Sequence, residues 1–211
     1  MTSTINLENQ IKELAKVYRE TLFVKINNRV QEMLIDDNSH YLIYQVLGIS
    51  HQEGQQIDVY QNKGRFLYKY AGSFLEDVAI LCFEYKFSNA QKKLKIENKL
   101  GSKPKTFEID CLVGNIAHEI KWRDATTDGD HITKEHTRIK NIVEFGYTPV
   151  RVMFYYPNRT QAIRIQETLK TLYHGLGGQY YFGESAWQYL KDYTGVDLKL
   201  ILTKIAKENN K

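Results

Sequence analysis

The chain has little cysteine and no long apolar run. Its two cysteines, Cys82 and Cys111, each lie in an apolar segment of the 211 residues. We therefore expect buried free thiols in a reducing compartment and not a disulfide framework. Apolar runs stay short of the ~20 residues that a membrane-spanning helix needs, and the polar segment 1–10 lacks the apolar core of a signal peptide. These absences predict a cytoplasmic protein with no membrane contact.

The chain also lacks a strong excess of either charge. Its net charge is +4, with 42% hydrophobic and 26% charged residues, as in ordinary globular proteins. A mild positive charge permits binding to a polyanion without demonstrating it. The length fits a single domain, residues 1–211. We divide it into a helical part over 1–50, a core over 73–173 and a helical carboxyl-terminal part over 174–211.

The first third of the chain is expected to be mostly helical. Apolar residues recur at helical spacing from Ile5 to Leu34 without an intervening Gly or Pro, which predicts a long amphipathic helix. A second, short helix is expected over 41–47. Residues 57–70 are rich in Tyr, Val and Phe and contain Gly64, which favours irregular structure or a short pair of strands.

A buried helix is expected over residues 74–87. Ser73 precedes it as a plausible N-cap, and Glu76 stands three residues later, as a capping box requires. Farther along, apolar runs and periodicity predict strands over 94–100, 106–113, 116–123 and 150–156, and helices over 132–145, 159–173, 184–193 and 198–207. Gly175–Gly178 is interpreted as a bend between helices. This order predicts an α/β fold, a mixed β-sheet flanked by helices.

The informative segment is a predicted hairpin. Gly114-Asn115 is a two-residue turn signal, and counting outward from it pairs Val113 with Ile116 and Cys111 with His118. The same register places Asp110 opposite Glu119.

It also places Glu108 opposite Lys121, on the face that carries Asp110 and Glu119. The opposite, mostly apolar face, with Ile109 and Ile120, is expected to enter the core.

Two carboxylates placed opposite each other repel, and a divalent cation between them removes that cost. Carboxylate oxygens select magnesium, manganese or calcium over softer metals. The alternative is a solvent-facing strand pair with an incidental Glu108–Lys121 ion pair.

The segment resembles a known nuclease superfamily. Asp110 with Glu119-Ile120-Lys121 is similar to the active site of the PD-(D/E)xK nucleases, although Ile109 replaces the usual proline. More narrowly, the runs 118–131 (HEIKWRDATTDGDH) and 147–159 (YTPVRVMFYYPNR) resemble type II restriction endonucleases of the ApaLI-like family. The resemblance extends over most of the chain and implies a restriction-endonuclease-like fold.

The resemblance implies hydrolysis of DNA phosphodiester bonds with Mg²⁺, for which Mn²⁺ can substitute. Asp110 and Glu119, with the backbone carbonyl of Ile120, would hold the metal, and Lys121 would orient or help deprotonate the attacking water. Such sites often take a further acid from a nearby helix. Glu76 is the first candidate, with Glu84 behind it, and a helix-capping role for Glu76 stays open.

The resemblance further implies double-stranded DNA as the partner, with the sequence GTGCAC as the site. A palindromic site calls for a homodimer, and a cognate methyltransferase is expected in the same system without direct contact. Polar residues after the hairpin are candidates for DNA contact: Arg123, Asp124, Thr126, Thr127, Asp128, His131, Lys134, His136 and Arg138. A solvated helix face with phosphate contacts alone is the alternative for this group.

Three other functions can be compared with the same residues. A zinc-protease motif at His118-Glu119 is excluded because Trp122 stands where the second His is required. A repair or junction-resolving nuclease of the same fold stays open, and so does a non-catalytic DNA-binding module with an incidental acidic pair. A restriction enzyme cleaves both strands at a fixed palindrome, which distinguishes it from a repair or junction-resolving nuclease. Magnesium-dependent cutting distinguishes it from a non-catalytic DNA-binding module.

Overall fold

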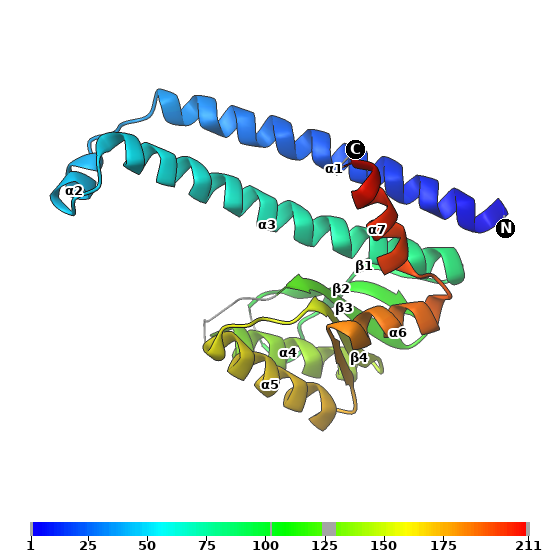
Figure 1. Ribbon diagram of the computed structural model, residues 1–211. Coiled ribbons are helices and arrows are strands. Elements are labelled where there is room, and N and C mark those ends of the chain that lie inside the picture. Colours follow the sequence, from blue (N-terminus) through cyan, green and yellow to red (C-terminus); the bar gives the residue numbers. More distant parts are fainter. Residues whose placement is uncertain (1, 102, 124–129, 210–211) are drawn as a thin grey trace. The chain divides into compact units, whose positions relative to one another are not determined.

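The computed structural model describes residues 2–101, 103–123 and 130–209 (Figure 1). In chain order the elements are α1 (Thr2–Leu34), α2 (Tyr41–Val46), α3 (His51–Lys86), β1 (Gln91–Glu97), β2 (Thr106–Val113), β3 (Ile116–Arg123), α4 (Asp130–Glu144), β4 (Thr148–Tyr155), α5 (Thr160–Gly175), β5 (Gln179–Phe182), α6 (Glu184–Thr194) and α7 (Leu198–Asn209). Within these ranges no helix combines the length and apolar character needed to cross a membrane.

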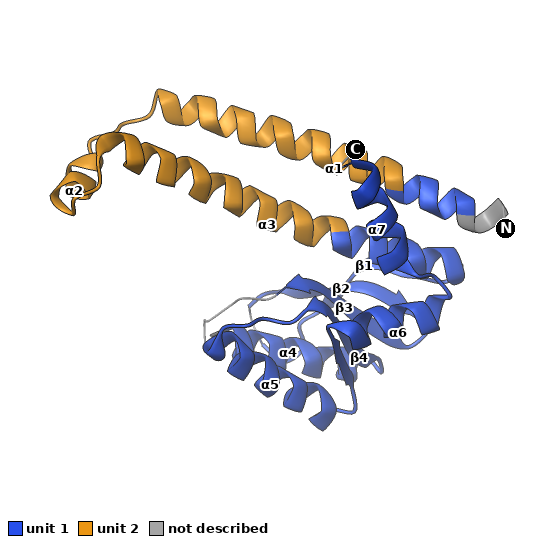
Figure 2. Ribbon diagram, in the orientation of Figure 1, with its two compact units in different colours: residues 1–11, 75–211 blue, residues 12–74 orange. Residues whose placement is uncertain are grey.

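The chain forms two compact units (Figure 2). Unit 1 comprises Met1–Ile11 and Leu75–Lys211 and contains the sheet, and unit 2 comprises Lys12–Phe74 and is helical. The predicted long first helix and the short helix over 41–47 are confirmed by α1 and α2.

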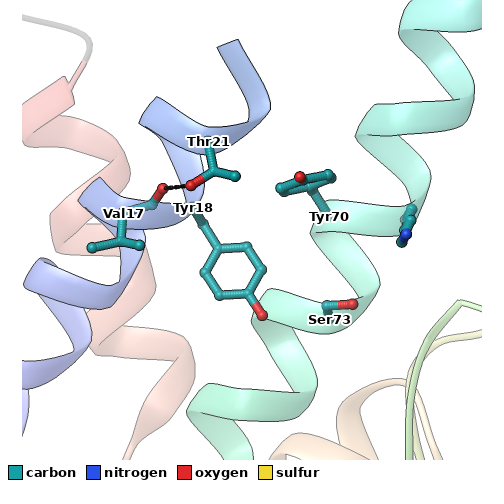
Figure 3. Close-up of a pocket in the computed structure, with 6 residues that line it drawn as sticks. Val17, Tyr18, Thr21, Tyr70 and Ser73 are labelled. Atoms are coloured by element: carbon teal, nitrogen blue, oxygen red, sulfur yellow. Dashed lines mark hydrogen bonds between the residues drawn. The ribbon is translucent and has the colours of Figure 1, made fainter. Parts of the chain in front are cut away.

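In unit 2, residues 57–70 belong to α3 and form no strand, so the prediction of irregular structure or a pair of strands is wrong. Val59, Phe66 and Tyr70 are half-buried at helical spacing in α3, and the Tyr18 ring of α1 packs edge-on against Tyr70, with ring centroids 6.0 Å apart. A pocket of about 330 Å³ opens between these two helices (Figure 3). Its lining is Val17, Tyr18, Thr21, Lys69, Tyr70 and Ser73.

The predicted start of a helix at Ser73 is also wrong, because α3 already begins at His51 and runs through Ser73 and Glu76 without a break. The capping box lies earlier in the chain. The Glu53 N–H donates to Ser50 Oγ over 3.2 Å, and the Ser50 N–H donates to Glu53 Oε2 over 3.1 Å. Glu76 is therefore no cap, and its carboxylate lies 3.3 Å from the Lys93 ammonium of β1.

Unit 1 is built on a five-stranded sheet in the order β1-β2-β3-β4-β5. The pairs β1–β2 and β2–β3 are antiparallel, while β3–β4 and β4–β5 are parallel, so the predicted mixed sheet is confirmed. The predicted bend at Gly175–Gly178 leads into β5, a strand of four residues that the sequence analysis did not identify.

Helices cover both faces of the sheet (Figure 1). On one face, α4 and α5 pack on the strands through a buried cluster made of Ile139, Ile165, Leu169, Tyr173 and Tyr180. On the other face, Phe83 near the end of α3 lies against His118 of β3, and Trp187 of α6 lies against Phe154 of β4. The central strands are therefore buried on both sides, as parallel strands require.

Gly178 provides a test of how α5 joins β5. A Cβ at Gly178 would lie 2.4 Å from the backbone oxygen of Pro149, whereas Gly175 has open space at the same position. We expect Gly178→Ala to lower the free energy of unfolding by about 1–3 kcal/mol through overpacking. Gly175→Ala, within α5, should be neutral or slightly stabilising. Urea unfolding of the two variants measures the difference, and equal stabilities would contradict this packing.

Candidate active site

The predicted hairpin is present with the predicted register. Val113 pairs with Ile116, Leu112 with Ala117, and Cys111 with His118, around a turn in which Gly114 has φ 59°. One residue farther from the turn, the Asp110 carboxylate accepts the Ile120 N–H over 2.7 Å. The Asp110 side chain therefore satisfies a backbone N–H of β3 next to Glu119.

Both faces of the hairpin are buried, which corrects the expectation of one core face. Asp110 and Glu119 are 6% and 3% exposed, so the alternative of a solvent-facing acidic strand pair is wrong. Ile109 and Leu112, which strict alternation would place on opposite faces, pack in one cluster with Ile142 of α4. Beside this point in β1, Lys93 has φ 52°, a strained conformation for a non-glycine residue.

Glu119 is held between two cations. The Lys121 ammonium lies 2.5 Å from Glu119 Oε1, and the Arg138 guanidinium of α4 contacts Glu119 Oε2. Lys121 also lies 4.0 Å from Asp110 Oδ2. The structure therefore brings Asp110, Glu119 and Lys121 together as the sequence analysis predicted, and it adds Arg138 as a direct neighbour.

The two carboxylates experience opposite electrostatic environments. Burial, and then the negative charge of Glu119, raise the pKa of Asp110 well above its ordinary value. Burial also raises the pKa of Glu119, but Arg138 and Lys121 outweigh it, so that pKa lies below its ordinary value. Burial lowers the pKa of Lys121, and the charges of Glu119 and Asp110 more than reverse this, so Lys121 stays an ammonium.

A second layer of buried charge supports Arg138. Glu135, three residues earlier on α4, is 3.3 Å from the Arg138 guanidinium and 3.1 Å from that of Arg151. The Tyr173 hydroxyl donates to the same Glu135 oxygen over 2.8 Å. Arg151 is fully buried in β4, so strand and helix are joined through an ion network that ends on Glu119.

Glu135, Arg151 and Tyr173 were not predicted as site residues. One signal was available, because Arg151 interrupts the apolar run of a predicted buried strand, where an unpaired charge is costly. Its partners could not be read from the sequence, since Glu135 and Tyr173 reach Arg151 only through the packing of α4 and α5 on the sheet.

Comparison with known protein families identifies the family of the chain. The family described as ApaLI-like restriction endonuclease matches residues 1–207. The chain belongs to this family. Comparison with curated proteins gave no match, and comparison with solved structures gave none. The fold is consistent with the restriction-endonuclease class, and the family makes the chain a nuclease whose substrate is DNA.

In this restriction endonuclease, the two candidates for a third acid lie on α3 and engage lysines of β1. Glu76 Oε1 is 3.3 Å from the Lys93 ammonium, and Glu84 Oε1 is 3.4 Å from that of Lys92. Glu76 contributes to raising the pKa of Asp110, after the effects of burial and Glu119. Glu76 therefore has a minor electrostatic effect on Asp110, and among the described interactions none links Glu84 to Asp110, which favours Glu76 as the candidate for the additional acid.

The structure describes only some of the candidates for DNA contact. Asp124, Thr126, Thr127 and Asp128 lie outside the described residues. Of the others, Lys134 is exposed, His131 and His136 are half-buried, and Arg123 donates to Asn158 over 3.3 Å.

Arg138 differs from all of these candidates. Its side chain is 13% exposed and contacts Glu119 and Glu135, so its described contacts are within the site.

The donor set fits a hard divalent cation. Asp110 and Glu119 offer carboxylate oxygens, which Mg²⁺ prefers, and burial followed by the charge of Glu119 raises the pKa of Asp110, so a further cation would favour its ionised form. Among the described residues no group of three or more His, Cys, Asp or Glu side chains is placed to hold a metal. A cation here would depend on the two carboxylates, the backbone carbonyl of Ile120 and oxygens from water or phosphate.

Without metal, neutralising Asp110 and neutralising Glu119 should change the free energy of unfolding in opposite directions. Because folding raises the pKa of Asp110, its ionised form is disfavoured in the folded protein at neutral pH. Asp110→Asn should raise the free energy of unfolding by about 1 kcal/mol. Glu119→Gln should lower it by roughly 3 kcal/mol, since two buried cations lose their counter-charge. Urea unfolding at pH 7 with a chelator tests this, and shifts of the same sign would contradict it.

Proposed function

We propose that the chain is a type II restriction endonuclease that cleaves both strands of DNA at a fixed palindrome with Mg²⁺. The observation that carries the proposal is the cluster of two buried carboxylates and one lysine in a chain of the ApaLI-like restriction endonuclease family. The resemblance to that family favours GTGCAC as the site. Mn²⁺ is expected to substitute for Mg²⁺ because both prefer oxygen ligands.

In the proposed reaction, a water oxygen bonds to phosphorus as one P–O ester bond breaks, the attacking water loses a proton to solvent, and the leaving oxygen takes a proton from solvent. Asp110 and Glu119, with the Ile120 carbonyl, would hold Mg²⁺, which when bound polarises a phosphoryl oxygen and acidifies water. The Lys121 side chain is 32% exposed, against 9% for Asp110 and 4% for Glu119. Lys121 is thus the member of the three that an approaching phosphate reaches most readily.

Lys121 has a definite role in this scheme. Burial lowers the pKa of Lys121, but the negative charges of Glu119 and Asp110 outweigh burial, so the pKa is raised. A protonated ammonium cannot act as a general base. It instead donates hydrogen bonds that orient the attacking water, and it offsets negative charge that develops on the phosphoryl oxygens.

Cleavage of a palindrome also requires two copies of the site. A two-fold axis through the DNA relates the two scissile bonds, so we propose a homodimer. Protection of the host's own DNA would come from a cognate methyltransferase of the same system, which need not contact this chain.

The proposal is tested by digesting a plasmid of known sequence with Mg²⁺ and sequencing the ends. The expected result is cutting of both strands at one palindrome, with no cutting in the presence of a chelator. A plasmid that differs only by a substitution in each GTGCAC site should stay intact. Nicking of one strand, or cutting that follows DNA structure and not sequence, would favour a repair or junction-resolving nuclease instead.

Lys121→Ala should separate cutting from binding. We expect the cleavage rate to fall at least about a hundredfold, because a charge that stabilises the transition state is lost. Specific binding should persist with Ca²⁺ in place of Mg²⁺, and Glu119→Ala should behave in the same way. Lys199→Ala is the matched control, since Lys199 is exposed on α7 and pairs with Glu184. Cutting at the normal rate by Lys121→Ala would overturn the assignment.

A further inference from the structure

Glu119 is already neutralised by the protein itself. Lys121 contacts Oε1 and Arg138 contacts Oε2 of a carboxylate whose side chain is 4% exposed. Each carboxylate oxygen keeps a further lone pair, but a positive group already lies against each one. A divalent cation that binds Glu119 is therefore repelled by the neighbouring cation unless that cation moves away.

The charge count of the buried cluster leads to the same conclusion. Among the described residues, the acids of the cluster are Asp110, Glu119 and Glu135, and its bases are Lys121, Arg138 and Arg151. These six groups carry no net charge when all are ionised, so a divalent cation would add positive charge beside three existing cations. In a buried site such an excess is strongly unfavourable unless a positive group moves away or an anion arrives.

Arg138 is the base with an alternative acid within reach. Glu135 lies three residues away on the same helix, on the same side of α4, and its Oε1 is already 3.3 Å from the Arg138 guanidinium. Rotation of one side chain would carry Arg138 from Glu119 to Glu135, with no movement of α4. Lys121, by contrast, has only the two acids of the site, Asp110 and Glu119, among its described ion pairs.

We propose that Arg138 is a positioning residue that holds Glu119 in the metal-free protein and shifts to Glu135 when a divalent cation takes Glu119 Oε2. This inference rests on the proposed metal-dependent function and adds a regulator of metal affinity to it. Arg138 fixes the rotamer of Glu119, and its positive charge competes with the incoming cation. The affinity of the free protein for metal is thereby lowered, and the phosphate of bound DNA, which brings negative charge, restores it.

The first test is the affinity of DNA-free protein for Mn²⁺, measured by electron paramagnetic resonance of the unbound ion. Arg138→Gln removes the competing charge and should tighten Mn²⁺ binding roughly tenfold, because each tenfold step corresponds to about 1.4 kcal/mol, a modest share of a buried charge–charge contact. Arg138→Lys keeps the charge and is the matched control, with an affinity within about threefold of the wild type. Glu119→Gln should abolish the Mn²⁺ binding that the wild type shows.

The second variant is expected to act in the opposite direction. Glu135→Gln weakens the alternative partner of Arg138 and leaves the guanidinium more firmly on Glu119, so Mn²⁺ binding should weaken several-fold. This variant also keeps the inference testable if Arg138→Gln does not fold. Circular dichroism establishes folding for each variant before the metal titration.

The outcomes distinguish the inference from the proposed function. If the wild type binds no Mn²⁺ at millimolar concentration, with or without DNA, the metal-dependent function fails. If the wild type binds Mn²⁺ but folded Arg138→Gln binds it no more tightly, or Glu135→Gln binds it no more weakly, the competition by Arg138 is wrong and the nuclease assignment stands.

Discussion

The buried carboxylate of Glu119 is the constraint on which the site depends. A carboxylate with 4% side-chain exposure stays ionised only if positive groups replace the water it has lost. β3 supplies one, Lys121, two residues along the same strand. The other, Arg138, must come from a different element, so the position of α4 over the sheet is a requirement of the site as well as a matter of packing.

Several polar contacts hold α4 in that position. At its amino-terminal part, Glu135 joins Arg151 of β4 and Tyr173 of α5. Farther along α4, Asn141 donates to Asn98 Oδ1 over 3.0 Å and accepts the Lys99 N–H over 2.7 Å. Partners spaced along one helix fix its rotation as well as its place, which apolar packing alone specifies less sharply. The direction of Arg138 toward Glu119 follows from that rotation.

Local signals carried the prediction of the hairpin and of its three site residues, because Asp110, Glu119 and Lys121 lie within twelve positions around a Gly-Asn turn. Local signals also misled. A Ser-x-x-Glu pattern occurs at both Ser50 and Ser73, and tertiary structure uses only the first as a helix start.

Two further parts of the structure could not be obtained from the sequence. β5 is a strand of four residues, too short for its alternation to stand out, and it forms by pairing with β4. The ion network around Arg151 depends on contacts between segments far apart in the chain. In the sequence alone, Glu135 and Arg138 look like exposed helix residues, and Arg151 looks like an anomaly in an apolar strand. Only the packed structure shows that these charges neutralise one another.

The two acidic residues of the site are chemically similar but differ in what a cation would do for them. Asp110, whose pKa is raised by burial and by Glu119, is short of positive charge, so an arriving cation relieves an existing cost. Glu119 already has two cations beside it, and an arriving cation would be repelled by them. Metal binding would therefore draw its favourable free energy from Asp110 and lose part of it at Glu119. A site arranged in this way keeps its geometry without metal, because Glu119 is fixed, and under the proposed function it would bind metal strongly only when further negative charge, such as a DNA phosphate, is present.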